Sequence, residues 1–251
     1  MKIAVISDIH GNLEAMKAVL ENIKQENCDK IFCLGDLAMA GPQPKETIDF
    51  IRDLSKNFDF EIIQGNTDEM IAYASDKIYE KIKAALPVMG EAYKSDIQTV
   101  TDAQKEYLKN LPRQKEIKIG NLKFLLVHGS PRRNNEDIFP DLDIKIVEEM
   151  ISSTDADLIL CGHTHIPCGY QTTKNQTVVN VGSVGRPFST TPRSCYCVIE
   201  CSDEKPSTFE VKHNLVDYDF EKSAKILEKR GFDGAEKLAE MLRHAANRYP
   251  Q

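Results

Sequence analysis

The chain has 251 residues, of which 41% are hydrophobic and 28% charged, with a formal net charge of −7. This composition is typical of a globular protein and excludes a disordered tail or a fibrous repeat. The length predicts one domain over residues 1–251, with a core large enough to need no disulfide bond. The negative net charge disfavours long nucleic acid as a partner, because that binding requires many Lys and Arg side chains against phosphates.

Compartment can also be predicted from the sequence. No apolar run approaches the roughly 18 residues that a membrane span requires, and the apolar run at residues 3–6 is too short for the core of a signal peptide. The seven cysteines are an odd number without a Cys-x-x-Cys pair, so we expect neither disulfide bonds nor a thiolate metal site. These features predict a cytoplasmic protein without a membrane partner.

Residues 1–67 alternate short apolar runs with segments of helical period. We expect strands at residues 3–6, 30–34 and 61–64. One predicted helix follows Asn12, which can cap it, and another begins near Pro44. The order strand, helix, strand, helix, strand is typical of a parallel sheet.

Residues 69–111 carry helical patterns only. Apolar side chains between residues 70 and 82 predict one helix, and Thr101 with Gln104 predicts a capping box for another that ends before Pro112. We interpret this segment as a cap-like helical insertion that covers one side of the sheet.

The remaining chain returns to strand patterns and ends in helices. Five further strands are expected, at residues 122–127, 157–161, 177–181, 194–200 and 208–213, with one helix at 141–152. Only short turns separate the last three strands, which predicts that they pair antiparallel. Residues 219–247 predict a C-terminal extension of two short helices, broken at Gly231 and Gly234.

Side chains that can bind metal follow five of these strands. They are Asp8 with His10, Asp36, Asn66, His128, and His163 with His165. Strand C-terminal ends are where α/β sheets place their sites, and residues i and i+2 of an extended segment point the same way, so each two-residue motif should face one ion. A lone Asp or His in such a place is usually structural. Four of the six histidines fall at these ends, however, which favours a shared site.

Seven ligands are too many for one ion and predict two, with Asp36 bridging. The first ion should bind Asp8, His10, Asp36 and His165, and the second Asp36, Asn66, His128 and His163. Nitrogen and oxygen ligands without thiolate favour Mn²⁺, our first expectation, or Fe, Zn²⁺, Ni²⁺ or Co²⁺. Two divalent ions carry more positive charge than two carboxylates and a bridging hydroxide offset, so the site as a whole keeps a net positive charge. The hydroxide is then the expected nucleophile, and a small phosphoester the expected substrate.

Other residues are candidates for contact with the substrate or the reaction. Arg132 and Arg133 follow His128 closely, and a guanidinium could hold a phosphoryl oxygen in a bidentate manner. The alternative for both is a solvated surface pair, and Arg132 is the preferred candidate. Asn12 and Thr67 are further expected substrate contacts. The predicted catalytic residues are His128, Asp36 and Asn66.

As a set, the metal-binding motifs resemble those of the calcineurin-like metallophosphoesterase family, and within it the small single-domain bacterial and archaeal phosphodiesterases. They read Asp8-Ile9-His10, Gly35-Asp36, Gly65-Asn66-Thr67-Asp68, Val127-His128-Gly129 and Gly162-His163-Thr164-His165. The resemblance implies an α/β fold, a four-layer αββα sandwich of two mixed β-sheets flanked by helices, with the dimetal site at one end. It also implies a homo-oligomer.

One position departs from the family pattern. Many relatives place a general-acid His where this chain has Thr67, and a Thr hydroxyl is too weak an acid for that role at neutral pH. The neighbouring Asp68 could supply a proton or orient another group, and we favour orientation. The departure predicts lower efficiency rather than loss of activity.

Three functions follow from these patterns. The leading hypothesis is a dimetal phosphodiesterase or phosphatase acting on a small phosphoester or nucleotide. The second is a catalytically weak scaffold or binding module of the same fold, although such relatives lose ligands and all seven are present here. The third is a dinucleoside polyphosphate hydrolase. The segment after Asp36 lacks the Asp-Arg-Gly run of protein serine/threonine phosphatases, which disfavours a phosphoprotein substrate.

Overall fold

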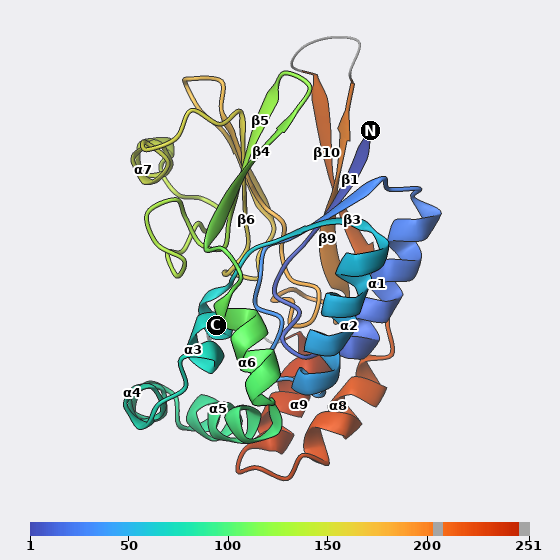
Figure 1. Ribbon diagram of the computed structural model, residues 1–251, viewed down its shortest axis with the longest axis vertical. Coiled ribbons are helices and arrows are strands. Elements are labelled where there is room, and N and C mark those ends of the chain that lie inside the picture. Colours follow the sequence, from blue (N-terminus) through green and yellow to red (C-terminus); the bar gives the residue numbers. More distant parts are fainter. Residues whose placement is uncertain (203–207, 246–251) are drawn as a thin grey trace.

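The computed structural model describes residues 1–202 and 208–245. Two mixed five-stranded sheets pack face to face, and helices cover both outer faces (Figure 1). The strand order is β10-β9-β1-β2-β3 in the first sheet and β4-β5-β6-β8-β7 in the second. This arrangement confirms the predicted four-layer α/β fold. No described helix is both long enough and apolar enough to span a bilayer.

The first sheet carries the alternation that the sequence predicted. Its strands are β1 (Lys2–Ile6), β2 (Lys30–Cys33), β3 (Asp59–Ile62), β9 (Ser194–Cys201) and β10 (Phe209–Val216). The first three are parallel, and β9 pairs antiparallel with both β1 and β10. Two helices that connect the parallel strands, α1 (Leu13–Gln25) and α2 (Pro44–Asn57), cover the outer face (Figure 1).

The second sheet has a parallel centre and antiparallel edges. Its strands are β4 (Gln114–Ile119), β5 (Leu122–Val127), β6 (Leu158–Cys161), β7 (Cys168–Gln171) and β8 (Thr177–Asn180). Strands β5, β6 and β8 are parallel, whereas β4 and β7 each pair antiparallel at an edge. Helix α7 (Ile144–Met150) covers the outer face of this sheet (Figure 1).

Alternating side chains of the strands form separate apolar layers. On β1, Ile3 and Val5 pack between the two sheets, while Ala4 and Ile6 join the layer under the helices. Between the sheets the rings of Phe32 and Phe124 meet edge to face with centroids 6.0 Å apart. Burying both faces of the sheets in this way holds the strand ends rigidly.

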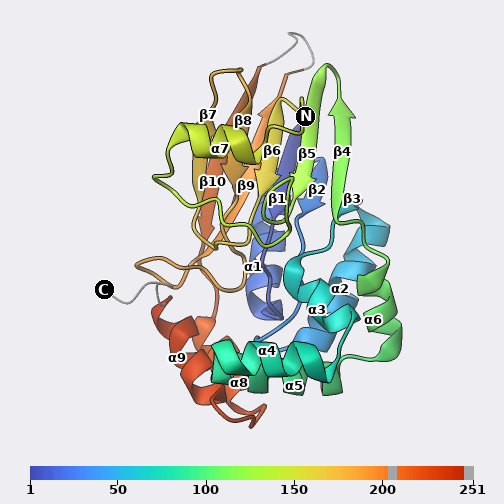
Figure 2. The ribbon, with the colours of Figure 1, turned by 90° about the vertical axis from the view of Figure 1, so that its left-hand side faces the viewer.

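The remaining helices gather at one end of the sandwich, the end at which β1 and β5 finish (Figures 1 and 2). They are α3 (Asn66–Ala72), α4 (Asp76–Ala85), α5 (Pro87–Thr99), α6 (Asp102–Lys109), α8 (Phe220–Glu228) and α9 (Ala235–His244). Helices α5 and α9 are in contact, so the predicted helical insertion and C-terminal extension form adjoining parts of one helical layer. The last two residues predicted for the extension, 246–247, lie outside the described chain.

The prediction that the last three strands pair with one another was wrong for the first of them. Strand β8 lies in the second sheet beside β6 and β7, while β9 and β10 pair in the first. The segment between β8 and β9 crosses from one sheet to the other. The expectation of a short turn was wrong here, because thirteen residues, 181–193, separate β8 from β9, which is enough for the chain to cross to the opposite sheet.

Other predicted boundaries also needed correction. The single helix expected between residues 70 and 82 is two, because the chain breaks at residues 73–75 and Ser75 caps α4. Helix α5 was not predicted, and α7 is shorter than expected because Asp143 caps it. Strands β4 and β7 were missed because both are edge strands in which exposed polar residues interrupt the apolar pattern. The capping box of Thr101 and Gln104 is confirmed.

Candidate metal centre

Five of the seven predicted ligand residues lie in tight turns rather than in extended strands, whereas Asn66 begins α3 and His128 directly follows β5. Asp8, His10, Asp36, His163 and His165 all have left-handed backbone conformations, with φ between 46° and 67°. Such angles are uncommon outside glycine and cost free energy, so surrounding contacts must hold them, and they concentrate at functional sites. The argument that each two-residue motif converges because it is extended was therefore wrong. The turns bring the side chains together instead.

Each of the two acids is oriented by a backbone amide from another strand end. The amide of His163 donates to Asp8 Oδ2 at 2.9 Å, and the amide of Thr67 donates to Asp36 Oδ1 at 2.9 Å. Both side chains are buried. The second oxygen of each acid, Asp8 Oδ1 and Asp36 Oδ2, consequently faces the histidines.

Three imidazoles present the same nitrogen atom, Nε2, to these acids. The Nδ1 atoms of His10, His128 and His165 lie 3.1, 2.8 and 2.7 Å from the carbonyl oxygens of Met39, Leu34 and Arg186. A carbonyl only accepts, so each Nδ1 carries a proton, and in the neutral form of each ring the lone pair lies on Nε2. A hydrogen bond of this kind at the far nitrogen fixes the tautomer and orientation of metal-binding histidines.

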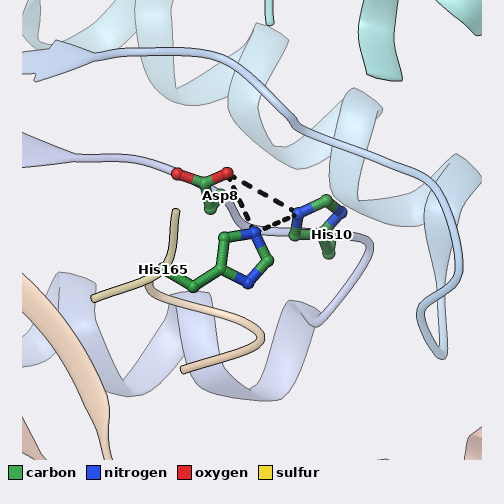
Figure 3. A group of neighbouring side chains, drawn as sticks. All are labelled: Asp8, His10 and His165. Carbon is green, nitrogen blue, oxygen red and sulfur yellow. Dashed lines mark hydrogen bonds and ion pairs between the residues drawn. The ribbon is translucent and has the colours of Figure 1, made fainter. Parts of the chain in front are cut away.

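Asp8, His10 and His165 form one candidate ligand group (Figure 3). Asp8 Oδ1 lies 3.6 Å from His10 Nε2 and 3.2 Å from His165 Nε2. The two Nε2 atoms themselves are 3.0 Å apart. Two lone pairs and an anionic oxygen that face one another at these distances fit a cation between them.

Asp8, Asp36 and His128 form the second group. His128 Nε2 lies 3.3 Å from Asp36 Oδ2 and 3.8 Å from Asp8 Oδ1. Asp36 Oδ2 is also 3.6 Å from His10 Nε2, so it faces one histidine of each group. Asp8 Oδ1 and His128 Nε2 are buried without a hydrogen-bond partner in the described structure, which fits the electron-pair donors of a metal site.

The other two predicted ligands are Asn66 and His163, of which His163 borders the second group without joining it. Asn66 Oδ1 is buried and has no hydrogen-bond partner among the described residues, so it can serve as an oxygen ligand. The ring of His163 lies 5.3 Å from that of His128, and its Nε2 is 3.4 Å from Asp137 Oδ1. Their role as ligands therefore stays a prediction.

Charge and burial shift the pKa values of the ligands. Burial alone would raise the pKa of Asp36, but His128 lowers it to about 2. Burial would likewise raise the pKa of Asp8, but His165 and His128 hold this pKa well below its usual range. Burial would lower the pKa of His128, yet the two acids raise it to about 10, so without a metal ion its Nε2 carries a proton, which metal binding would displace. Burial and the charge of His128 lower the pKa of His163 to about 4, which leaves its lone pair available at neutral pH.

Two glycines allow the turns to approach the acids closely. A Cβ atom on Gly162 would lie 2.1 Å from Ser7 Oγ and 2.4 Å from Asp8 Oδ2. A Cβ atom on Gly65 would lie 2.1 Å from Asp36 Oδ1. Any side chain at these positions would displace the acid, which is the physical reason that both motifs contain Gly before the ligand.

Asp68 orients the turn that carries Asp36. It is fully buried and accepts hydrogen bonds from the amides of Asp36, Leu37 and Gly65 at 2.8–2.9 Å. These contacts match the expectation that Asp68 orients a neighbour, and they place no proton of Asp68 toward the metal-binding side chains.

Sequence reasoning missed a residue that supports the turn at Asp8. The hydroxyl of Ser183 donates to the Asp8 carbonyl at 2.8 Å and accepts from the amide of Arg186. Ser183 thereby connects the turn of Asp8 to Arg186, the residue whose carbonyl holds His165. Ser183 lies in the Gly-rich segment after β8, and that composition was the only signal in the sequence.

Two of the predicted substrate contacts have other partners. Asn12 is fully buried: its amide donates to the carbonyl of Gly185, and its oxygen accepts from Ala15 and Ser223. It caps α1, so its assignment to substrate binding was wrong. The hydroxyl of Thr67 donates to the carbonyl of Ala38 at 3.0 Å, and its proton is thereby engaged within the protein.

A cavity of about 260 Å³ opens beside His128. Its lining includes Arg113, Arg132 and Arg133. Arg132 donates from Nε and Nη2 to both oxygens of Glu136, and from Nη1 to Glu149 at 3.0 Å. Among the described residues, three of its five N–H groups thus have acceptors, and two remain for an anion.

Comparison with known proteins agrees with this site. Residues 1–204 match the family model of the calcineurin-like phosphoesterase superfamily domain. Uncharacterized protein MJ0912 of Methanocaldococcus jannaschii is 31% identical over 245 residues, which cover 91% of this chain and 93% of that protein. A metallophosphoesterase from Sphaerobacter thermophilus superposes with a TM-score of 0.76 at 25% identity, and hypothetical protein PH1004 of Pyrococcus horikoshii OT3 with 0.86 at 24%. Both superpositions cover 98% of this chain and 99% of the other.

Proposed function

Since this chain belongs to the calcineurin-like phosphoesterase superfamily and is a metal-dependent phosphoesterase, we propose that it is a dimetal phosphodiesterase for small phosphoesters. The observation that carries the proposal is the convergence of three Nε2 atoms on the free oxygens of Asp8 and Asp36. Both acids are buried, and backbone carbonyls fix the tautomers of the three histidines. The site is therefore organised to hold cations.

Asp8, His10 and His165 would hold one ion, and His128, Asn66 and His163 the other, with Asp36 shared. Asp36 is suited to bridge because its Oδ2 faces a histidine of each group. The absence of thiolate from this donor set favours Mn²⁺ first and Fe, Zn²⁺, Ni²⁺ or Co²⁺ next. When bound, two divalent ions supply an activated water and positive charge for the oxygens of a phosphoryl group.

Arg132 is positioned to hold the substrate anion. Glu136 and Glu149 fix its guanidinium on the wall of the cavity beside His128, with two N–H groups available. A planar guanidinium in a fixed orientation matches two oxygens of a phosphoryl group. Arg113 and Arg133 line the same cavity, but each is paired with an acid, Glu69 and Glu136 respectively, so Arg132 is the preferred contact for the anion.

Proton donation to the leaving oxygen is the weak point of the site. The hydroxyl of Thr67 is engaged with Ala38, and Asp68 accepts backbone hydrogen bonds. Substrates whose leaving group is stable as an anion should therefore be hydrolysed best. A bis(4-nitrophenyl) ester meets that condition.

The first experiment measures hydrolysis of bis(4-nitrophenyl) phosphate by purified protein after dialysis against Mn²⁺ or a chelator, together with elemental analysis. We expect about two ions per chain and turnover only with metal. Asp36→Asn should lower turnover at least about 100-fold, because it removes the shared anionic ligand. Asp49→Asn is the matched control, since Asp49 forms an ion pair with Arg52 on the surface of α2. Unchanged turnover in Asp36→Asn would refute the mechanism.

A second experiment separates the substrate alternatives. Phosphomonoesters, phosphodiesters, nucleotides and a dinucleoside tetraphosphate are compared under Mn²⁺, with wild type and Arg132→Lys. The proposal expects diesters to have the highest kcat/KM and Arg132→Lys to raise KM about tenfold, because Lys lacks the bidentate fork. Preference for the dinucleoside tetraphosphate would instead support the polyphosphate hydrolase. Protein that binds metal without hydrolysing any of these compounds would support the binding module.

A further inference from the structure

The two predicted metal positions are supported by different parts of the molecule. His128 is held by the carbonyl of Leu34, whose own amide bonds to Ile6 as a continuation of the sheet. His10 and His165 are instead held by the carbonyls of Met39 and Arg186, which lie in loops. The orientation of these two imidazoles consequently depends on whatever fixes those loops.

The loop that holds His10 is strained. Met39 and Ala40 both have left-handed backbone angles, with φ of 90° and 60°, although neither is glycine. Gly41 follows so closely against His10 that a Cβ atom there would lie 1.5 Å from the His10 carbonyl oxygen. Such a conformation persists only where neighbouring groups hold it.

Asp96 and Arg230 supply that hold from the helical layer. Asp96 on α5 is fully buried, and its Oδ2 accepts from the Ala40 amide at 2.7 Å. Arg230 follows α8, and its Nη1 donates to the Gly41 carbonyl at 2.6 Å. The two side chains form an ion pair at 2.7 Å in which the Arg230 side chain is only 10% exposed. Together they bond to adjacent residues of the strained loop.

The loop that holds His165 contacts the same helical layer. The guanidinium of Arg186 lies against the sulfur atoms of Met89 on α5 and Met241 on α9, at 3.5 and 3.7 Å. Its backbone carbonyl accepts from His165 Nδ1. Both imidazoles of the first ligand group are thus oriented by loops that are anchored on α5 and the C-terminal helices, whereas His128 is not.

We propose that Asp96 and Arg230 are positioning residues that hold the loop of Met39, and through it the His10 imidazole, in the orientation that binds the first metal ion. This inference rests on the proposed dimetal function. Arg230 lies beyond residues 1–204, the part of the chain that matches the family model. The C-terminal extension therefore controls one of the two metal positions and leaves the other to the sheets.

The test is metal binding by Arg230→Gln, measured by equilibrium dialysis against Mn²⁺ and elemental analysis, with circular dichroism to show folding. Wild type should bind two ions. The variant should bind one ion with wild-type affinity and the other about 10- to 100-fold more weakly, because a displaced loop withdraws the Met39 carbonyl, the partner of the ligating His10. Asp96→Asn, which keeps the shape and one acceptor, should weaken the same ion and gives the same readout if Arg230→Gln does not fold.

A double-mutant comparison identifies the position that is affected. Adding Arg230→Gln to His10→Ala should weaken metal binding no further, whereas adding it to His128→Ala should weaken the remaining ion. Arg243→Gln is the matched control, because Arg243 pairs with Glu221 and Glu228 inside the same helices without touching the loop. It should leave both affinities unchanged even where it lowers the melting temperature.

Three results would overturn the inference. Wild-type affinities for both ions in Arg230→Gln and Asp96→Asn would show that the loop needs no such support. Equal weakening of both ions would show a general loss of structure rather than a local one. Wild-type protein that binds no ion after dialysis would contradict the proposed function itself, and the inference with it.

Discussion

The Nε2 atoms of His10 and His165 face each other at 3.0 Å, although the Nδ1 proton of each ring is donated to a backbone carbonyl. Two neutral imidazoles in this orientation direct their lone pairs at the same point, with Asp8 Oδ1 beside it. Such a contact is repulsive unless a cation, either a proton or a metal ion, lies between the two nitrogen atoms. The folded chain therefore keeps an arrangement that a metal ion stabilises.

Removal of metal should lower stability as well as activity. An ion that binds only the folded state at 100 times its Kd adds about 2.7 kcal/mol, so we expect Mn²⁺ to raise the melting temperature by several degrees over protein in chelator. Differential scanning fluorimetry measures this shift. Ca²⁺ at the same concentration is the control and should have a smaller effect, because it prefers oxygen ligands. Equal melting temperatures in Mn²⁺ and in chelator would contradict the proposal that these side chains bind metal ions.

Gly162→Ala should impair the site directly. The new methyl group would lie 2.1 Å from Ser7 Oγ and 2.4 Å from Asp8 Oδ2, so Asp8 must move. We expect overpacking to cost about 1–3 kcal/mol of unfolding free energy and metal-dependent turnover to fall at least tenfold. Gly169→Ala is the control, since its nearest neighbour would be 3.8 Å away. Wild-type activity in Gly162→Ala would show that this close approach is not required.

Asp68→Asn should destabilise the turn of Asp36. Asn offers one acceptor oxygen where the carboxylate receives three backbone N–H groups, so at least one buried amide loses its partner. Urea denaturation should show a loss of about 2–3 kcal/mol. Asp53→Asn, which removes an exposed acid that pairs with Lys56, should leave the urea denaturation curve essentially unchanged. Matching curves for both variants would mean that Asp68 does not hold the turn.

Stability should depend on pH through Glu136. Burial alone would raise its pKa, but hydrogen bonds from Arg132, Ser130 and Arg133 lower it to about 2 from the usual 4.5. A lowered carboxyl pKa stabilises the fold fully above the unfolded value of about 4.5, and the contribution disappears as pH falls toward 2. Glu136→Gln should therefore be about 1–2 kcal/mol less stable than wild type at pH 7, after allowance for its partly exposed partners.

Denaturant unfolding of both proteins between pH 7 and pH 3 checks this dependence. The difference in unfolding free energy between wild type and Glu136→Gln should stay constant at pH values well above 4.5 and narrow as the pH falls below 4.5. Glu46→Gln, at an exposed position on α2, should leave the free energy of unfolding unchanged. A gap that stays constant over this range would assign the effect to packing rather than to charge.

The identity of the metal-binding side chains could be predicted from local sequence. Short apolar strands followed by Gly and an Asp, Asn or His define the ends of β1, β2, β3, β5 and β6, and parallel strands end at one edge of a sheet. Strand identity and burial are properties of a few neighbouring residues, and so are helix caps such as Thr101 with Gln104. This local character explains why the parallel strands and the candidate ligands at their ends could be predicted from the pattern, whereas the four-layer sandwich was implied only by the resemblance to the family.

Only the tertiary structure decided how those side chains are used. The partners that set their geometry lie far away in sequence: Met39 for His10, Arg186 for His165, and Asp68 for the amide of Asp36. Asn12 was misassigned for the same reason, since Gly185 and Ser223 satisfy it from distant segments. A residue's type and its near neighbours determine what it can bind. The loops that fold around it determine which atom is left free to do so, and no local pattern records that choice.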